Sequence, residues 1–378
     1  MEQMRKLPIG IQTFEKLREG NYLYVDKTAM VYQIASVSVP YFLSRPRRFG
    51  KSLLISTFEV YFQGRKDLFQ GLAIEKLETK WEQYPVFHLD LNAENYKNAD
   101  SLRIILNSNL ERWEGLYGRG AGEDSLSTRF SGVIRRACEQ TGKQVVVLID
   151  EYDKPLLQTI LDKSLLDEYR SILKAFYGVL KSADRYLRFV FLTGVTKFAQ
   201  VSVFSDLNQL NDISMDREYN ALCGVTKDEL VKVFTPEIQR LSESEELTFE
   251  ETLFRLERQY DGYHFCENTV VGLFNPFSLL NVFQKTKFGN YWFQTGTPTY
   301  LVSLLKQSDY DLRLLVNGVE VTASAFSEYR AEANNPLPMI YQSGYLTIKD
   351  YDKEFLLYTL SFPNDEVRYG FLNFLLCV

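Results

Sequence analysis

Two short stretches of the chain carry the side chains with the clearest chemical potential, and the first is a basic loop. Residues 45–52 read RPRRFGKS and directly follow the apolar residues 40–44. In a strand–loop–helix context, a Gly-Lys-Ser run turns backbone N–H groups toward phosphates, lysine reaches the β and γ phosphates, and serine ligates Mg²⁺. We therefore interpret Gly50, Lys51 and Ser52 as part of a phosphate-binding loop. The alternative is a basic helix cap.

This loop departs from the usual pattern at its start. Arg45 stands where glycine is usual, and Pro46 removes one N–H donor. The next two arginines either contact phosphates and stabilise transition-state charge or bind an acidic partner surface, and the sequence leaves both open. The residues predicted to bind nucleotide are Arg47, Arg48, Phe49, Gly50, Lys51, Ser52 and Leu53.

The second stretch is the apolar run 145–149, which ends in Asp150 and Glu151. An acidic group at a strand end can hold Mg²⁺, and a carboxylate within hydrogen-bond reach of water can act as a general base. We predict that Asp150 and Ser52 hold Mg²⁺ and that Glu151 activates water. The alternative is a solvated acidic loop after a buried strand. Asp153 and the next residue could extend the site, but the following proline favours an ordinary loop.

Thr193 ends the next strand-like run, residues 186–192. Ligands of parallel sheets lie beyond the carboxyl ends of the strands, so we predict that Thr193 lies near the γ-phosphate and orients water. It then joins Lys51 and Glu151 as the predicted catalytic set. Simple capping of the strand is the alternative.

Alternating strands and helices must position these residues. Apolar runs predict strands at 40–44, 86–91, 144–149 and 186–192, and helical patterns occupy 52–63, 98–117, 126–141 and 164–181. This order predicts an α/β fold of the P-loop NTPase type, with a mostly parallel sheet flanked by helices.

The pattern changes near residue 224. Residues 226–229, TKDE, form a capping-box signature, and helical text continues to about residue 258. Residues 345–349 and 355–360 predict a β-hairpin with a helix on each side. We therefore expect a P-loop ATPase domain at 1–223, a helical lid at 224–330 and a winged-helix-like unit at 331–378.

Composition narrows the functional classes. Four widely spaced cysteines disfavour a zinc site. With only two histidines in the chain, a Ser-His-Asp catalytic triad is also disfavoured. The chain has no apolar run of about 18 residues and no apolar leader, so we expect a cytoplasmic protein without a membrane span. The net charge is −6, and residues 340–378 hold three basic and five acidic residues, so charge does not support nucleic-acid binding.

The combination of motifs resembles the AAA-ATPase-like family of bacterial P-loop proteins, related to archaeal-type ATPases and the AAA+/ASCE group. The resemblance rests on LPIGIQTF at 7–14, YVDKT at 24–28, RPRRFGKS at 45–52, LIDEYD at 148–153, TGVTKF at 193–198, NPFS at 275–278 and NDEV at 364–367. The family loop has this arginine-rich form, so the missing glycine counts less against function.

The resemblance implies ATP as ligand, Lys51 and Ser52 on phosphate and Mg²⁺, Asp150 on Mg²⁺, Glu151 as base and Thr193 as sensor. It also suggests that residues 14–28 pack near the base. Similar proteins commonly continue into a PD-(D/E)xK nuclease-like domain, but this chain stops at residue 378, about where that domain would begin, so we expect no nuclease activity from it.

Three functions follow from this reading. The first is a Mg²⁺-dependent ATPase that acts as a conformational switch by moving the helical lid. The second is an ATP- or ADP-binding regulatory or scaffold protein with little hydrolysis, and the third is a nucleic-acid-binding regulator that uses the winged-helix-like unit. The sequence leaves open the protein partner, the oligomeric state and any arginine supplied by a second subunit.

Overall fold

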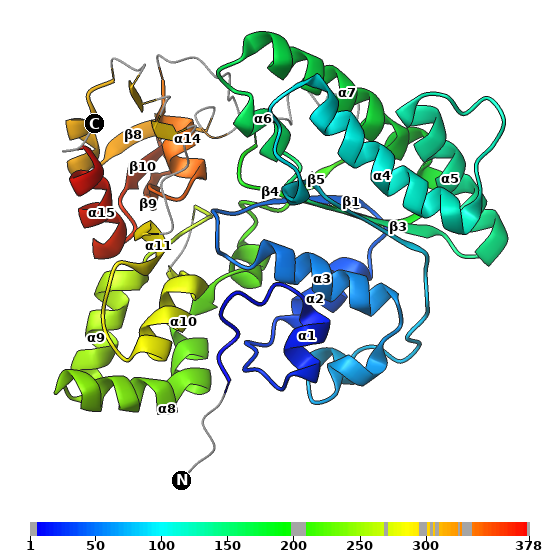
Figure 1. Ribbon diagram of the computed structural model, residues 1–378. Coiled ribbons are helices and arrows are strands. Elements are labelled where there is room, and N and C mark those ends of the chain that lie inside the picture. The colour runs from blue at the N-terminus through cyan, green and yellow to red at the C-terminus, as the bar shows by residue number, and fades with distance from the viewer. Residues whose placement is uncertain are drawn as a thin grey trace. The chain divides into compact units, whose positions relative to one another are not determined.

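The computed structural model describes residues 6–197, 209–267, 271–294, 301–302, 305–306, 310–323, 326 and 335–375. The chain forms two compact units, each built from separate stretches of sequence. The sheet unit comprises Lys27–Ser44 and Leu54–Ile213. The loop unit comprises the described residues within Met1–Asp26, Arg45–Leu53 and Ser214–Val378. Figure 1 shows the elements of both units, and each is described by itself below.

The sheet unit is built on five parallel strands in the order β2-β3-β4-β1-β5. The strands are β1 (Pro40–Ser44), β2 (Val86–Asp90), β3 (Val145–Asp150), β4 (Leu187–Gly194) and β5 (Asn211–Asp212). Every residue of β3 is buried, as its continuous apolar run predicts for a strand covered on both faces. The four strands predicted from the sequence are confirmed, whereas β5 has only two residues and was not predicted.

Helices cover both faces of this sheet, so the predicted α/β class is confirmed. In Figure 1 the sheet separates α2 and α3 from α4, α5 and α7. The helices are α2 (Thr28–Ala35), α3 (Lys51–Phe62), α4 (Ala99–Tyr117), α5 (Leu126–Thr141), α6 (Lys154–Gln158) and α7 (Lys163–Ser182). The first three residues of α3 belong to the loop unit.

Local signals explain where these helices begin and end. The Asn98 side chain accepts from two backbone N–H groups of α4, and Ser125 forms a capping box with Thr128 at the start of α5. Gly64 follows α3 with φ +71°, and the N–H of Arg65 donates to the carbonyl of Val60. This geometry is the left-handed helix end that favours glycine.

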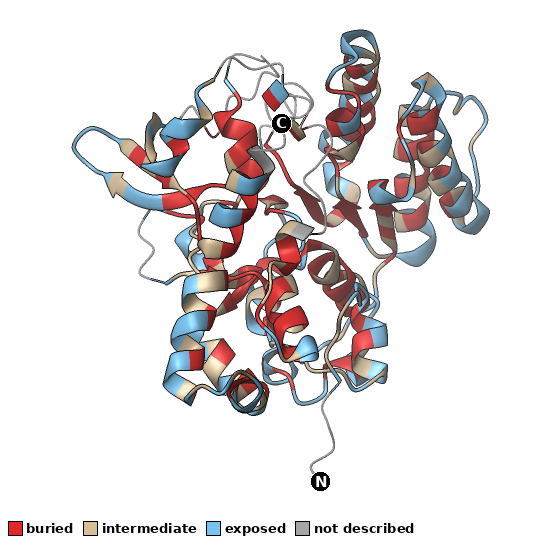
Figure 2. Cartoon of the chain, turned by 60° about the vertical axis from the view of Figure 1, so that its left-hand side comes forward, coloured by how far each residue is buried: buried red, intermediate tan, exposed pale blue. Residues whose placement is uncertain are grey.

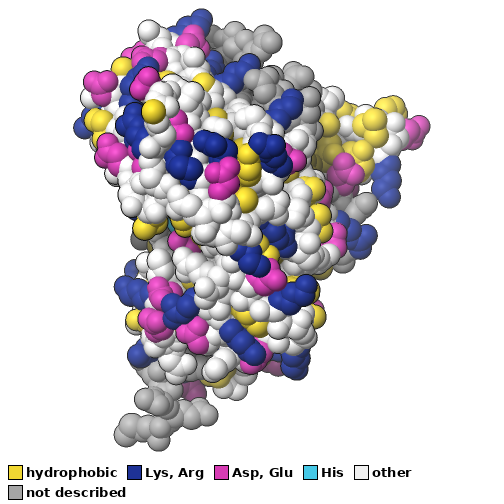
Figure 3. Space-filling view, turned by 90° about the vertical axis from the view of Figure 1, so that its right-hand side faces the viewer, with side chains coloured by type: hydrophobic (Ala, Val, Ile, Leu, Met, Phe, Trp, Pro, Cys, Tyr) yellow, Lys and Arg dark blue, Asp and Glu magenta, His cyan; other side chains and the backbone are white. Residues whose placement is uncertain are grey.

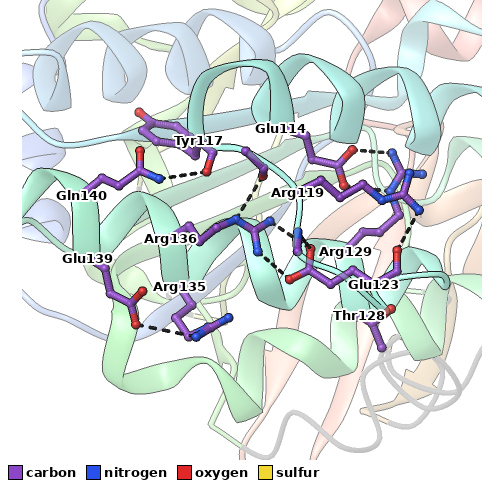
Figure 4. Close-up of polar contacts among 12 residues, drawn as sticks. Glu114, Tyr117, Arg119, Glu123, Thr128, Arg129, Arg135, Arg136, Glu139 and Gln140 are labelled. Atoms are coloured by element: carbon purple, nitrogen blue, oxygen red, sulfur yellow. Dashed lines mark hydrogen bonds and ion pairs between the residues drawn. The ribbon is translucent and has the colours of Figure 1, made fainter.

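Two ion pairs hold α5 in place, a buried one to α4 and a partly buried one to the connection between the two helices. Arg129 donates through Nε and Nη2 to the two carboxylate oxygens of Glu114, at 2.8 and 2.7 Å. Arg136 makes a similar two-point contact with Glu123, which lies in the connection between the helices. Figure 4 shows both pairs, together with the exposed Arg135. The hydrogen bond from Arg129 holds the pKa of Glu114 below its ordinary value.

The loop unit is mainly helical and contains two small antiparallel sheets. Its strands form the pair β6 (Val225–Thr226) and β7 (Leu273–Phe274), and a three-stranded sheet in the order β8-β10-β9, with β8 (Val319–Thr322), β9 (Thr347–Asp352) and β10 (Leu357–Ser361). Its helices are α1 (Phe14–Glu19), α8 (Lys227–Glu245), α9 (Phe249–Tyr260), α10 (Pro276–Lys285), α11 (Tyr291–Gln294), α14 (Leu337–Gln342) and α15 (Asp365–Leu375).

Two local features predicted for the loop unit are present. Thr226 and Glu229 form the predicted capping box at α8, and β9 pairs with β10 as the predicted hairpin between α14 and α15. Apolar side chains of α8, α9 and α10 form one core, which includes Leu230, Leu256 and Leu279. The domain limits at 223 and 330 and the lid and winged-helix assignments stay predictions, and parts of both C-terminal domains, such as 295–300 and 327–334, lie outside the described residues.

The burial pattern separates the core from the surface within each unit. In Figure 2 the sheet strands are buried along most of their length, while the outward helix faces are exposed. On the face shown in Figure 3, Lys and Arg side chains are interspersed with Asp and Glu, so this face carries no broad area of one charge sign. Within the described part of the chain, each helix is too short or too polar to span a bilayer.

Candidate functional site

The basic loop lies between β1 and α3, in the strand–loop–helix context that the sequence predicts. Two of its residues adopt positive φ, Arg48 at +68° and Gly50 at +96°. A non-glycine residue with positive φ is uncommon and costs free energy, so surrounding contacts must hold Arg48 in this conformation. Gly50 accommodates the same region without strain because it lacks Cβ. The loop therefore has a specific, constrained backbone.

Lys51 begins α3 and is 4% exposed. Its Nζ donates to the carbonyl oxygens of Arg45 and Pro46, at 3.0 and 3.3 Å. The ammonium group is thus held against the start of its own loop. Ser52 and Leu53 follow in the first turn of α3, and both are half-buried.

Arg45, which replaces the usual glycine, is 1% exposed. Its guanidinium donates to backbone carbonyl oxygens of the segment after the sheet unit, at 2.8 Å to Ser214, 3.3 Å to Tyr219 and 3.4 Å to Asn220. It also lies 4.3 Å over the ring of Phe265. Sequence reasoning treated Arg45 as a departure from the pattern and did not predict this buried anchoring role.

The middle of the loop is also fixed by contacts within the loop unit. Trp292 donates its indole N–H to the carbonyl of Arg47 at 3.1 Å, and the exposed Arg48 guanidinium lies 4.7 Å over the ring of Phe277. Phe49 is buried, with its ring packed edge-on against two other aromatic rings. The side chain of Phe49 therefore belongs to an aromatic core, and a contribution of this residue to ligand binding would come from its backbone.

The predicted acidic residues lie at the carboxyl edge of the sheet. Asp150 ends β3 and is 3% exposed, and Thr193, at the end of β4, is fully buried. The Thr193 hydroxyl donates to Oδ1 of Asp150 at 2.5 Å. The structure thus brings these two predicted residues together, and Thr193 fixes the orientation of the Asp150 carboxylate.

Glu151 is half-buried and adopts φ +53°, in the left-handed region. A glutamate in this conformation is strained by about 1–3 kcal/mol, and such strain is most often retained at functional sites. The turn at Glu151 sends the chain from β3 toward α6. The structure thus places Glu151 in a constrained turn directly after Asp150.

Asp153, which the sequence left between an extension of the acidic site and an ordinary loop, makes structural contacts. It is fully buried, and its carboxylate accepts from the N–H groups of Val195 and Thr196 and from the Thr196 hydroxyl. Tyr152 adds a bond from its hydroxyl to the Thr196 carbonyl at 2.7 Å. These contacts clamp the turn after β3 to the segment after β4. Phe198, the last residue of the motif at 193–198, lies outside the described residues.

Gly194 allows this clamp to close. A Cβ at this position would lie 2.4 Å from an atom of the Tyr152 ring and 2.8 Å from a carboxylate oxygen of Asp153. Both distances are shorter than van der Waals contact, so only glycine fits without displacement. The glycine after Thr193 is therefore required by close approach of the two strand ends.

His88 and Glu59 form a second polar feature of the sheet unit. His88 lies on β2 and Glu59 on α3, with 2.8 Å between Nδ1 and Oε2. Burial lowers the pKa of His88, but the hydrogen bond to Glu59 together with the negative charges of Glu59, Asp150 and Asp90 outweighs burial and leaves this pKa above its ordinary value. No sequence pattern marks this pair, because its members are distant along the chain.

The predicted Mg²⁺ ligands fit the chemistry of the ion. Mg²⁺ prefers oxygen ligands, keeps several waters and usually takes one or two protein ligands. Asp150 offers a carboxylate of which Thr193 binds one oxygen, and Ser52 offers a hydroxyl. Among the described residues there is no cluster of three or more His, Cys, Asp or Glu side chains, so a multidentate protein cage is not present in that part of the chain.

The parallel sheet, the phosphate-loop sequence between β1 and α3, and the acidic end of β3 are consistent with a P-loop NTPase. A family model described as "Predicted AAA-ATPase" matches residues 8–204, and the chain belongs to this AAA-ATPase-like family. A protein of Azotobacter chroococcum mcd 1, described as an uncharacterized protein in the vnfD 5' region, is 39% identical over 367 residues, which cover 96% of this chain and 68% of that protein.

Proposed function

We propose that this protein binds ATP with Mg²⁺ and hydrolyses it. Lys51 binds the β and γ phosphates, residues 47–53 supply backbone N–H groups, and Ser52 with Asp150 holds Mg²⁺. Glu151 acts as general base toward the attacking water. Thr193 contributes by orienting the Asp150 carboxylate.

One observation supports this proposal above the others. The loop leaves β1 at the carboxyl edge of the sheet, where Ser44 pairs with Gly194 of β4, and Ile149 of β3 pairs with Leu192 on the other side. Ligands of open α/β sheets bind beyond this edge. The basic loop and the acidic strand end therefore follow strands whose carboxyl ends share one edge of one parallel sheet.

The Glu151 backbone supports its role as base. Its positive φ directs the side chain differently from that of a residue continuing the strand, and the clamp through Asp153 fixes the turn that follows. A base held in one position loses little entropy when water and phosphate are bound. The proposed division of labour is therefore that Asp150 holds the metal and Glu151 takes the proton.

The test is phosphate release from ATP in the presence of Mg²⁺. Lys51→Ala is expected to abolish turnover, and Glu151→Gln is expected to lower turnover while ATP binding persists. Lys163→Ala and Glu168→Gln are controls outside the predicted site, because Lys163, like Lys51, is the first residue of a helix, and Glu168, like Glu151, is a half-buried glutamate. Turnover that persists unchanged in both site variants would refute the proposal.

A second candidate function is binding of ATP or ADP with little hydrolysis. It is favoured by Pro46, which removes a donor from the loop, and by the carbonyl contacts of the Lys51 ammonium, which phosphates must replace or share. Thermal stabilisation by ATP without phosphate release above buffer would select this function. Thermal stabilisation with Glu151-dependent phosphate release would select the ATPase.

We further propose that the ATPase works as a conformational switch, with residues 224–330 as a helical lid and 331–378 as a winged-helix-like unit. The long capped helices α8 and α9 and the hairpin between α14 and α15 support these assignments. Hydrogen exchange of α8 and α9 with and without a non-hydrolysable ATP analogue tests the switch, and identical protection would count against it. A salt-dependent gel shift on duplex DNA tests the nucleic-acid alternative.

A further inference from the structure

Arg45 connects the basic loop with the segment 214–220: its side chain binds that segment, and its backbone carbonyl binds Lys51. Its side chain is bound to carbonyl oxygens of residues 214, 219 and 220, and its own carbonyl accepts from Lys51 at 3.0 Å. Few covalent bonds separate the guanidinium from that carbonyl. One of the two printed carbonyl acceptors of the Lys51 ammonium thus belongs to the residue whose side chain is anchored to the 214–220 segment, and the other belongs to the next residue, Pro46.

The chemistry of arginine suits this anchor. A guanidinium presents several N–H donors in one rigid plane, so it can bind several carbonyl oxygens at once and still stack on an aromatic ring, as it does on Phe265. Lysine has a single compact ammonium and cannot reproduce both contacts. Glycine, the usual residue here, would supply none of them.

Two further contacts show that the start of the loop is held closely. Gly344 adopts φ +89°, and a Cβ there would lie 2.6 Å from Cβ of Pro46. The Trp292 indole is bound to the carbonyl of Arg47, two residues after Arg45. Because Trp292 is 6% exposed and touches the loop directly, its fluorescence reports the position of the loop.

We propose that Arg45 is a positioning residue for the phosphate-binding lysine: its anchoring to the 214–220 segment sets the place of the Lys51 ammonium and thereby the affinity for the nucleotide phosphates. The segment 214–220 thus takes part in the nucleotide site by holding Arg45. This inference rests on the proposed function, since it needs Lys51 to bind phosphate.

The experiment measures KM and kcat for ATP in Arg45→Met and Arg45→Lys. Loss of charged hydrogen bonds is expected to raise KM by about tenfold or more, with a smaller change in kcat, and Arg45→Lys is expected to restore little. Arg129→Met is the matched structural control, because Arg129 is also a buried arginine but lies between α4 and α5. Arg313→Met is the exposed control.

A second readout does not depend on turnover. The tryptophan emission of Arg45→Met is compared with that of the same variant carrying Trp292→Phe, so that the Trp292 contribution is obtained by difference. A shift of the Trp292 emission relative to wild type is expected, with none in Arg129→Met. The variant Arg45→Gly is expected to show the same emission shift and rise in KM. Guanidinium added at millimolar concentration is expected to reverse both changes in this variant.

The outcomes separate this inference from the proposed function. If KM and Trp292 emission in Arg45→Met match those of Arg129→Met, the positioning role is overturned. If wild type binds no ATP, the proposed function and the affinity claim both fail, and the emission shift alone then decides whether Arg45 holds the loop. A raised KM with an emission shift and rescue by guanidinium supports the inference in full.

Discussion

Two buried arginines in this molecule are held in different ways. Arg45 of the loop unit donates to backbone carbonyls, whereas Arg129 of the sheet unit donates to both oxygens of Glu114. A carboxylate fixes the guanidinium and cancels its charge, while carbonyl dipoles fix it without cancelling the charge. The contrast shows two ways of holding a buried arginine: Arg129 joins two side chains of the sheet unit, whereas Arg45 joins its own loop to the backbone of residues 214–220.

Glu366 extends the comparison to a buried acid in the loop unit. Its two oxygens accept from the Ser278 hydroxyl and from the backbone N–H of Trp292, at 2.7 and 2.8 Å. Burial raises the pKa of Glu366 to about 7, whereas the contact with Arg129 lowers the pKa of Glu114. The pKa values of these two glutamates therefore shift in opposite directions, because the partners of Glu366 are neutral groups and the partner of Glu114 is a cation.

The largest expected effect comes from breaking the ion pair. Arg129→Met leaves Glu114 buried beside an apolar side chain, so the free energy of unfolding is expected to fall by about 3–5 kcal/mol. Chemical denaturation measures this loss. In a double-mutant cycle with Glu114→Gln, the combined loss is expected to be clearly smaller than the sum of the two single losses. Additive losses would show that the two side chains do not stabilise each other.

The next effect is a pH dependence from Glu366. Because its pKa is higher in the folded protein than the usual 4.5, the protonated form stabilises the fold at low pH, and this contribution is lost as pH rises through about 7. Its full size is about 3 kcal/mol at most. Glu366→Gln removes the titration, so the difference in unfolding free energy between wild type and this variant should change between pH 4.5 and 7. A difference that stays constant across this range would contradict the assignment.

A smaller effect tests the loop without changing charge. Gly344→Ala places a Cβ 2.6 Å from Cβ of Pro46 at a residue with φ +89°. Strain and displacement are expected to cost about 1–3 kcal/mol and to raise the KM for ATP. Gly142→Ala is a suitable control, since its φ is also positive but no atom lies near the added Cβ. If both variants change the KM for ATP equally, the contact between residue 344 and Pro46 does not influence nucleotide affinity.

The smallest effect is expected at the surface. Arg135 and Glu139 are one helical turn apart, with 3.9 Å between the charged atoms and about half of each side chain exposed. Arg135→Ala should change the free energy of unfolding by less than about 0.5 kcal/mol, because solvent screens such pairs. Thermal unfolding at low and high salt checks this. A loss comparable to that of Arg129→Met would show that burial does not distinguish the two pairs.

Helices and strands could be predicted from the sequence where a local pattern of apolar or capping residues determines them. The apolar run 145–149 and the capping residues Thr226 and Glu229 specify their structure within a few residues. The role of Arg45 was not predictable, because its carbonyl acceptors lie about 170 residues further along the chain and carbonyls leave no mark in the sequence. The left-handed backbone of Glu151 depends on tertiary contacts for the same reason, and the two-residue strand β5 is too short to form a pattern.

The alternation of the chain between the two units has a consequence for how the protein is made. The chain leaves the loop unit after Asp26, returns to it for Arg45–Leu53 and returns again after Ile213. During synthesis, the basic loop leaves the ribosome long before Ser214, Trp292 and Gly344, which contact it in the finished protein. The nascent chain therefore holds an incomplete loop until most of its length has been translated, and nucleotide affinity is expected to appear late, after the sheet has already formed.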